Sequence, residues 1–213
     1  MLNRYARAAV TRILTPVAKL LMRLGVSPDV VTIIGTLGVC LGALVFFPRG
    51  ELLVGVLVIT AFVFSDTVDG VMARMQERSS SWGAFLDSTL DRMGDAAIFA
   101  GLAIWFFQGG DDRVMAWLAL ACLVLGSLVS YARARAEGLG MHADVGIAER
   151  ADRLVATLVT TGFVGMGLPE VVLKVVLALL AVASLITVVQ RILVVRRQVR
   201  DAGSSSGATA TAS

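Results

Sequence analysis

The chain has 213 residues, of which 57% are hydrophobic and only 16% are charged, and its mean hydropathy is +0.82. A soluble domain of this size needs a far more polar surface, whereas lipid covers the outside of a membrane protein. The net charge is +3, but the basic residues are scattered at the ends of apolar segments and form no single stripe, which excludes a nucleic-acid-binding face.

Residues 2–24 have the periodicity of an amphipathic helix that lies in the membrane interface. At about 100° per residue, one broad apolar face contains Leu2, Val10, Ile13, Leu14, Val17, Leu20, Leu21 and Leu24. Arg12, Lys19 and Arg23 cluster on the opposite face. Because arginines interrupt the apolar residues, this segment is not predicted to be a cleavable signal peptide.

Six apolar stretches follow, each long enough to cross a hydrocarbon core of about 30 Å as a helix. They are predicted near residues 29–47, 52–73, 84–108, 113–136, 152–168 and 170–194. Ser27 as N-cap and Pro28 at the first helical position begin the first stretch. The predicted fold is therefore an all-α integral membrane protein with six transmembrane helices after an N-terminal interfacial helix. Residues 1–200 form its single domain, and the small polar residues of 201–213 predict a disordered tail.

Lysine and arginine residues predict the orientation of these spans. The loops after the first, third and fifth spans contain only Arg49, Arg113 and Lys174, whereas the other ends carry most of the basic residues. Both termini are therefore expected on the cytoplasmic side of the plasma membrane, together with the end of the second span.

Four aspartates lie at helical spacing on the second and third predicted spans. Asp66 and Asp69 are three residues apart, and Asp87 and Asp91 are four apart, so each pair shares one helix face. We expect the two helices to be antiparallel neighbours because the loop between them is short. The four carboxylates then converge at the cytoplasmic boundary of the membrane.

Such a cluster predicts a site for divalent cations, because an unpaired charge costs at least about 2.5 kcal/mol in a membrane helix. Oxygen ligands suit Mg²⁺, Mn²⁺ or Ca²⁺ and not zinc, and two ions about 4 Å apart are typical of phosphoryl transfer. Gly70 and Ala73 leave room for a bulky ligand, and Arg74 can pair with a phosphate. Asp95 is predicted to be a structural partner of Arg92 or Arg74.

The pattern Asp-x2-Asp-Gly-x2-Ala-Arg-x8-Gly-x3-Asp-x3-Asp resembles the complete signature of the CDP-alcohol phosphatidyltransferases. Its fixed positions are Asp66, Asp69, Gly70, Ala73, Arg74, Gly83, Asp87 and Asp91. The six spans and the interfacial helix also resemble that family, so the likeness covers nearly the whole chain before the tail.

The resemblance implies that an alcohol attacks the β-phosphorus of a CDP-linked lipid and that CMP leaves. It implies a homodimer and two Mg²⁺ ions, with Mn²⁺ as an alternative, held by Asp66, Asp69, Asp87 and Asp91. Asp91 is also the implied general base. The implied contacts to the CDP-lipid are Pro28, Asp29, Val30, Val31, Thr32, Gly70, Ala73, Arg74 and Ser80.

A second group of residues points to the acceptor. Several arginines on three helices reach the predicted cytoplasmic side, where guanidinium groups can bind a phosphate. The pattern resembles the actinobacterial phosphatidylinositol phosphate synthases, whose acceptor is L-myo-inositol 1-phosphate. The residues that match their acceptor pocket are Ser130, Arg133, Arg153 and Arg191. Arg133 replaces an expected lysine, which keeps the charge and changes its geometry.

Three other interpretations stay open. Phosphatidylglycerophosphate synthase, or another member of the same family, would use a different acceptor with the same aspartates. An aromatic prenyltransferase would need two well-separated aspartate motifs and more spans. A membrane ion transporter would carry acidic residues deep in its spans and inverted repeats, neither of which the sequence displays.

Overall fold

The computed structural model describes residues 15–75 and 81–210, and within these ranges it contains helices and no strand. The chain divides into two compact units, one that ends at Asp111 and one that begins at Asp112. We call them unit 1 and unit 2 and describe each by itself. The all-α fold class predicted from the sequence is confirmed.

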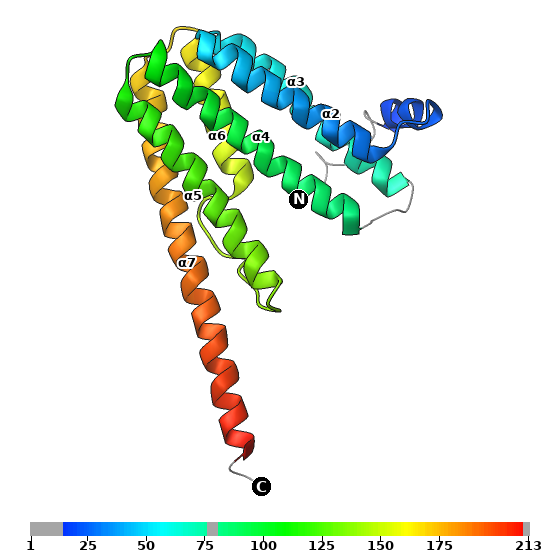
Figure 1. Ribbon diagram of the computed structural model, residues 1–213, viewed down its shortest axis with the longest axis vertical. Coiled ribbons are helices and arrows are strands. Elements are labelled where there is room, and N and C mark those ends of the chain that lie inside the picture. Colours follow the sequence, from blue (N-terminus) through cyan, green and yellow to red (C-terminus); the bar gives the residue numbers. More distant parts are fainter. Residues whose placement is uncertain (1–14, 76–80, 211–213) are drawn as a thin grey trace, which may run out of the picture. The chain divides into compact units, whose positions relative to one another are not determined.

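Unit 1 is built around α2 (Pro28–Leu41), which contacts both α3 (Leu52–Met75) and α4 (Ser81–Gln108) (Figure 1). A π-helical stretch η1 (Gly42–Phe46) and a 3₁₀ turn η2 (Phe47–Arg49) extend α2. Direct contacts between α3 and α4 are few among the described residues. Among the described residues, α3 and α4 are therefore connected mainly through α2.

Small residues explain this close packing around α2. A Cβ at Gly38 would lie 2.2 Å from the Phe62 ring of α3, and a Cβ at Gly101 of α4 would lie 2.5 Å from the carbonyl oxygen of Ala43. Glycine at these positions lets backbones approach as they do in membrane helix pairs. Gly101 of α4 thus serves the packing inside unit 1.

The cap predicted for the first span is confirmed, because the Ser27 hydroxyl accepts from the Val30 N–H and Pro28 is the first helical residue. Before it, residues 15–23 are helical, and Ala18 is buried against α2 and α3. The side chains of Val17, Leu20 and Leu24 are exposed. Residues 1–14, which carry most of the predicted interfacial helix, lie outside the described residues.

Unit 2 consists of α5 (Arg113–Glu137), α6 (Arg150–Gly165) and α7 (Glu170–Ala210), and α7 contacts both of the others (Figure 1). Asp112 caps α5, since its carboxylate accepts from the Met115 N–H at 3.1 Å. The ammonium of Lys174 lies 2.5 Å from the same carboxylate, and these two donors lower the pKa of Asp112. The N-terminal ends of α5 and α7 are thereby tied together.

The bounds of α6 and α7 differ from the predicted ones. The helix α6 begins at Arg150, before residue 152, because Glu149 and Asp152 form a capping box in which the Glu149 N–H donates to the Asp152 carboxylate. The helix α7 continues to Ala210, past the predicted end of the sixth span at residue 194 and into the segment predicted to be disordered.

Three helices are long and apolar enough to cross a membrane by length and composition, within the part of the chain that the structure describes. They cover Pro28–Arg49, Arg113–Glu137 and Glu170–Ala202. Large apolar side chains are exposed along all three, which is the surface that a lipid bilayer covers.

Candidate functional site

The first two aspartates of the motif lie in the C-terminal half of α3, within one continuous helix. The side chains of Asp66, Asp69, Ala73 and Arg74 lie outside what the structure describes. Gly70, between them, is described: a Cβ built there would meet no described heavy atom within 4 Å. Helix packing within the described residues therefore gives no reason for a glycine at this position.

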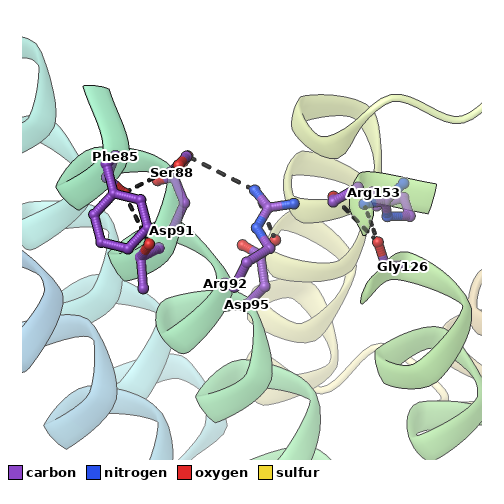
Figure 2. Close-up of polar contacts among 9 residues, drawn as sticks. Phe85, Ser88, Asp91, Arg92, Asp95, Gly126 and Arg153 are labelled. Carbon is purple, nitrogen blue, oxygen red and sulfur yellow. Dashed lines mark hydrogen bonds and ion pairs between the residues drawn. The ribbon is translucent and has the colours of Figure 1, made fainter. Parts of the chain in front are cut away.

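The other two aspartates lie one turn apart on α4, as predicted. Asp87 is exposed and the Asp91 side chain is 20% exposed. Figure 2 shows Arg92 beside Asp91 and Asp95, with its Nη2 3.7 Å from the Asp91 carboxylate and 3.6 Å from the Asp95 carboxylate. The predicted pairing of Asp95 with Arg92 is confirmed.

Convergence of all four carboxylates stays a prediction. No group of three or more histidine, cysteine, aspartate or glutamate side chains is close enough to hold a metal ion among the described residues, which exclude the side chains of Asp66 and Asp69. The described pair, Asp87 and Asp91, supplies oxygen ligands of the kind that Mg²⁺ and Mn²⁺ prefer.

Only part of the segment 28–32, which was predicted to contact the nucleotide, is accessible at the start of α2. Val31 packs in the core beside α3, and the buried Thr32 hydroxyl donates to the Pro28 carbonyl at 3.1 Å. Asp29 is half-buried, and its carboxylate accepts from the indole N–H of Trp82 at 3.2 Å. Pro28, Asp29 and Val30 are thus the accessible members, and Ser80 lies outside the described residues.

In unit 2 the Arg153 side chain is buried, with only 2% of the residue exposed. Its Nη1 donates to the Ala148 carbonyl at 2.9 Å and its Nη2 to the Gly126 carbonyl at 3.4 Å (Figure 2). A Cβ at Gly126 would lie 3.3 Å from Nε of this arginine, so the glycine makes room for the guanidinium.

Arg191 is the second buried arginine, at 6% exposure, on the face of α7 toward α5. Its Nε donates to the Val145 carbonyl at 2.9 Å and its Nη1 donates to the Val129 carbonyl. A buried charge needs partners of this kind. The hydrogen bonds of Arg153 and Arg191 therefore join all three helices of unit 2 to the α5–α6 loop, residues 138–149.

The remaining two predicted acceptor residues lie on α5. Arg133 is about half exposed and is held by two carboxylates: its Nε lies 2.9 Å from Glu137 Oε1, and its Nη2 lies 2.7 Å from Asp144 Oδ1. The Ser130 hydroxyl donates to the Gly126 carbonyl at 3.3 Å. The four predicted acceptor residues thus lie on the three helices of unit 2, and Arg133, Arg153 and Arg191 contact the α5–α6 loop.

Sequence reasoning missed the residues that hold this loop. Thr187 accepts from the N–H groups of Ile147 and Ala148, each at 3.2 Å, and the His142 backbone exchanges hydrogen bonds with Gln198. Gly146 has φ +146°, and a Cβ there would lie 2.3 Å from Thr187 Cγ2. The one available signal was that Thr187 precedes Arg191 by four residues, on the same helix face.

Comparison with known proteins places these residues in a family context. Residues 25–147 match the model of the CDP-alcohol phosphatidyltransferase family. The phosphatidylinositol phosphate synthase of Streptomyces avermitilis is 53% identical over 214 aligned positions, which cover 98% of this chain and 88% of that protein.

Two solved structures of the Mycobacterium tuberculosis phosphatidylinositol phosphate synthase are also similar. The structure with CDP-DAG bound has a TM-score of 0.83 at 44% identity, over 86% of this chain and 94% of that one. The complex with manganese and citrate has a TM-score of 0.82 at 43% identity, over 85% of this chain and 88% of that one.

Proposed function

The chain belongs to the CDP-alcohol phosphatidyltransferase family, and we propose that it transfers the phosphatidyl group of CDP-diacylglycerol to L-myo-inositol 1-phosphate. The products are phosphatidylinositol phosphate and CMP. The observation that carries the proposal is the complete aspartate motif, placed on α3 and α4 of a chain that matches such a synthase over 98% of its length.

In this reaction a hydroxyl oxygen of the acceptor forms a bond to the β-phosphorus of CDP-diacylglycerol. The bond between that phosphorus and the oxygen that bridges to CMP breaks, and CMP leaves with the bonding electrons. Asp91 is proposed to accept the hydroxyl proton, because its half-buried carboxylate lies one turn from Asp87 on the same face.

Asp66, Asp69, Asp87 and Asp91 are proposed to hold two Mg²⁺ ions, with Mn²⁺ as an alternative. The donor set fits, because all four are carboxylates on two helices that both pack on α2. When bound, the ions would neutralise the diphosphate and stabilise CMP as the leaving group. The manganese complex of the similar synthase supports a divalent metal.

The nucleotide end of the lipid is proposed to lie at Gly70. Glycine inside a helix costs about 0.5–1 kcal/mol relative to alanine, and the described packing does not require it. A glycine at residue 70 would allow the ligand to approach the helix backbone closely, which explains why glycine occupies this position. Ala73, Arg74 and Ser80 are proposed as further contacts, together with the segment 28–32, whose N–H groups open a helix.

The phosphate of the acceptor is proposed to bind at Ser130, Arg133, Arg153 and Arg191. Three guanidinium groups around one loop supply positive charge for a phosphate dianion, and Arg133 supplies the exposed N–H donors. Arg133 is the most exposed of the three, so we assign it the direct contact with the phosphate.

The protein is a membrane protein, with three helices suited to cross a bilayer in the described residues. We propose that α2 to α7 all cross the plasma membrane, with the active site and both termini on the cytoplasmic side. The distribution of lysine and arginine supports this orientation. We also propose a homodimer, as the family resemblance implies.

An acceptor panel tests the proposal. The purified full-length enzyme is given CDP-diacylglycerol and Mg²⁺ with inositol 1-phosphate, inositol, glycerol 3-phosphate or serine, and CMP release is measured. We expect inositol 1-phosphate to give the highest kcat/KM. Preference for glycerol 3-phosphate would instead establish a phosphatidylglycerophosphate synthase.

A further inference from the structure

We propose that Asp144 and Glu137 tune the affinity for the acceptor, as counter-ions of Arg133 that the phosphate of the acceptor displaces. The inference rests on the proposed function, because it concerns the acceptor of the same reaction. It assigns a role to two carboxylates that the aspartate motif does not include.

The geometry gives Arg133 two carboxylate partners at once. Glu137, one turn further along α5, lies 2.9 Å from Nε, and Asp144 from the α5–α6 loop lies 2.7 Å from Nη2. Both distances are those of charge-assisted hydrogen bonds. A phosphate that binds this guanidinium through the same N–H groups must therefore replace at least one carboxylate oxygen.

These ion pairs are exchangeable because they are solvated. The side chains of Arg133, Glu137 and Asp144 are 51%, 50% and 59% exposed. Ion pairs exposed to this degree contribute little to stability, since water and salt screen them. The pairs of Arg133 thus differ from the buried hydrogen bonds of Arg153 and Arg191, which an incoming ligand would break only at the cost of unsatisfied backbone groups.

The position of Asp144 is fixed by its loop. The carbonyl of the next residue, Val145, accepts a hydrogen bond from Arg191. The Thr187 hydroxyl accepts from the N–H groups of residues 147 and 148. The loop is thereby attached to α7 on both sides of Gly146. These hydrogen bonds fix the backbone next to Asp144, so its carboxylate is held beside Arg133.

Binding of the acceptor exchanges one negative partner of Arg133 for another. A phosphate dianion brings its own negative charge and can offer two oxygens to the guanidinium, which compensates for the loss of a carboxylate. A neutral polyol brings no charge and leaves the carboxylate in place. The two carboxylates therefore compete with the phosphate for Arg133, and the acceptor binds only by exchanging with them.

The test compares Asp144→Asn and Glu137→Gln with the unmodified enzyme. Each substitution removes the charge and keeps an oxygen that can accept from Arg133, so the shape of the site is preserved. We expect the KM for inositol 1-phosphate to fall about two- to fivefold in each variant. The KM for CDP-diacylglycerol is expected to change less than twofold. The variant Asp144→Glu keeps the negative charge, so its KM for inositol 1-phosphate should stay close to that of the unmodified enzyme.

A matched control is Glu170→Gln, which removes one carboxylate from the other end of α7, about 30 Å along the helix from Arg191. It is expected to change neither KM. An acceptor KM that rises in Asp144→Asn would overturn the inference, because it would mean that the carboxylate positions Arg133 for binding. An unchanged acceptor KM in both variants would overturn it as well.

Failure of the proposed function has a separate signature. If the unmodified enzyme uses glycerol 3-phosphate and not inositol 1-phosphate, the acceptor assignment is wrong, and the same variants are measured with glycerol 3-phosphate. The counter-ion role concerns the phosphate group that both acceptors carry. A fall in KM for that substrate would support the role, and its absence would contradict it.

Discussion

Unit 1 and unit 2 both carry charged side chains within an apolar chain, and they accommodate them in different ways. In unit 1 the described acids are placed by helical spacing, with Asp87 exposed and Asp91 half-buried on one face of α4. In unit 2 Arg153 and Arg191 are buried, and backbone carbonyls of α5 and the α5–α6 loop accept their N–H groups. Charge in unit 1 is available to a ligand, whereas part of the charge in unit 2 holds the protein together.

This difference predicts how substitutions divide between chemistry and structure. Replacing an acid of unit 1 should impair turnover and leave folding intact. Replacing a buried arginine of unit 2 should affect both acceptor binding and the stability of the loop, because an unsatisfied buried carbonyl costs about 1–3 kcal/mol.

The largest effect is expected for Asp91→Asn. The amide cannot accept the hydroxyl proton, so kcat should fall by about 10²–10⁴-fold while CDP-lipid binding persists. CMP release and CDP-lipid binding by thermal shift measure the two quantities. Asp95→Asn, one turn further on α4 and also beside Arg92, should retain most of the activity. Equal loss in both variants would contradict the role of Asp91.

Arg191→Ala should come next. Loss of the guanidinium removes positive charge from the proposed acceptor site and frees the Val145 carbonyl, so the KM for inositol 1-phosphate should rise about tenfold or more. The KM for CDP-diacylglycerol should change less than twofold. Arg196→Ala, on an exposed position of the same helix, is the control. An equal rise of both KM values would remove Arg191 from the acceptor site.

Gly146→Ala tests the loop itself. The backbone φ of +146° and the contact of a Cβ with Thr187 Cγ2 should together lower the free energy of unfolding by about 1–3 kcal/mol. Thermal unfolding in detergent measures the loss. Combining the change with Thr187→Ser, which keeps the hydroxyl and removes the methyl group, should recover part of it. No loss in Gly146→Ala would mean that the loop is not anchored as described.

The smallest effect is expected for Gly70→Ala, and its direction is informative. Alanine should stabilise α3 by about 0.5–1 kcal/mol, because no described atom lies within 4 Å of the new Cβ. The KM for CDP-diacylglycerol should nevertheless rise several-fold if the nucleotide approaches here. Gly101→Ala is the structural counterpart, and it should destabilise the protein because its Cβ would meet the Ala43 carbonyl.

The features that followed from the sequence are local ones. The Ser27 cap, the i,i+4 spacing of Asp87 and Asp91, and the contact of Arg92 with Asp95 depend only on neighbouring residues of one helix. Arg191 also interrupts an apolar run, a local feature that is visible in the sequence. Local chemistry and helical periodicity suffice for statements of this kind.

The features that the sequence did not predict depend on contacts between distant segments. The partners of Arg191 are backbone carbonyls 46 and 62 residues away, and backbone groups have no residue-specific signal. The packing of α2 between α3 and α4 also depends on contacts between separate segments. So does the ion pair of Arg133 with Asp144, which lies eleven positions after Arg133 in the chain. Such contacts follow from tertiary packing, which a single pattern does not specify.

The central claim is that aspartates of α3 and α4 hold divalent cations that activate a CDP-linked lipid. Its most direct test is CMP release by the purified enzyme from CDP-diacylglycerol and inositol 1-phosphate, before and after removal of metal with EDTA. We expect turnover to stop in EDTA and to return when Mg²⁺ or Mn²⁺ is added in excess. Undiminished turnover in the metal-free enzyme would contradict the account.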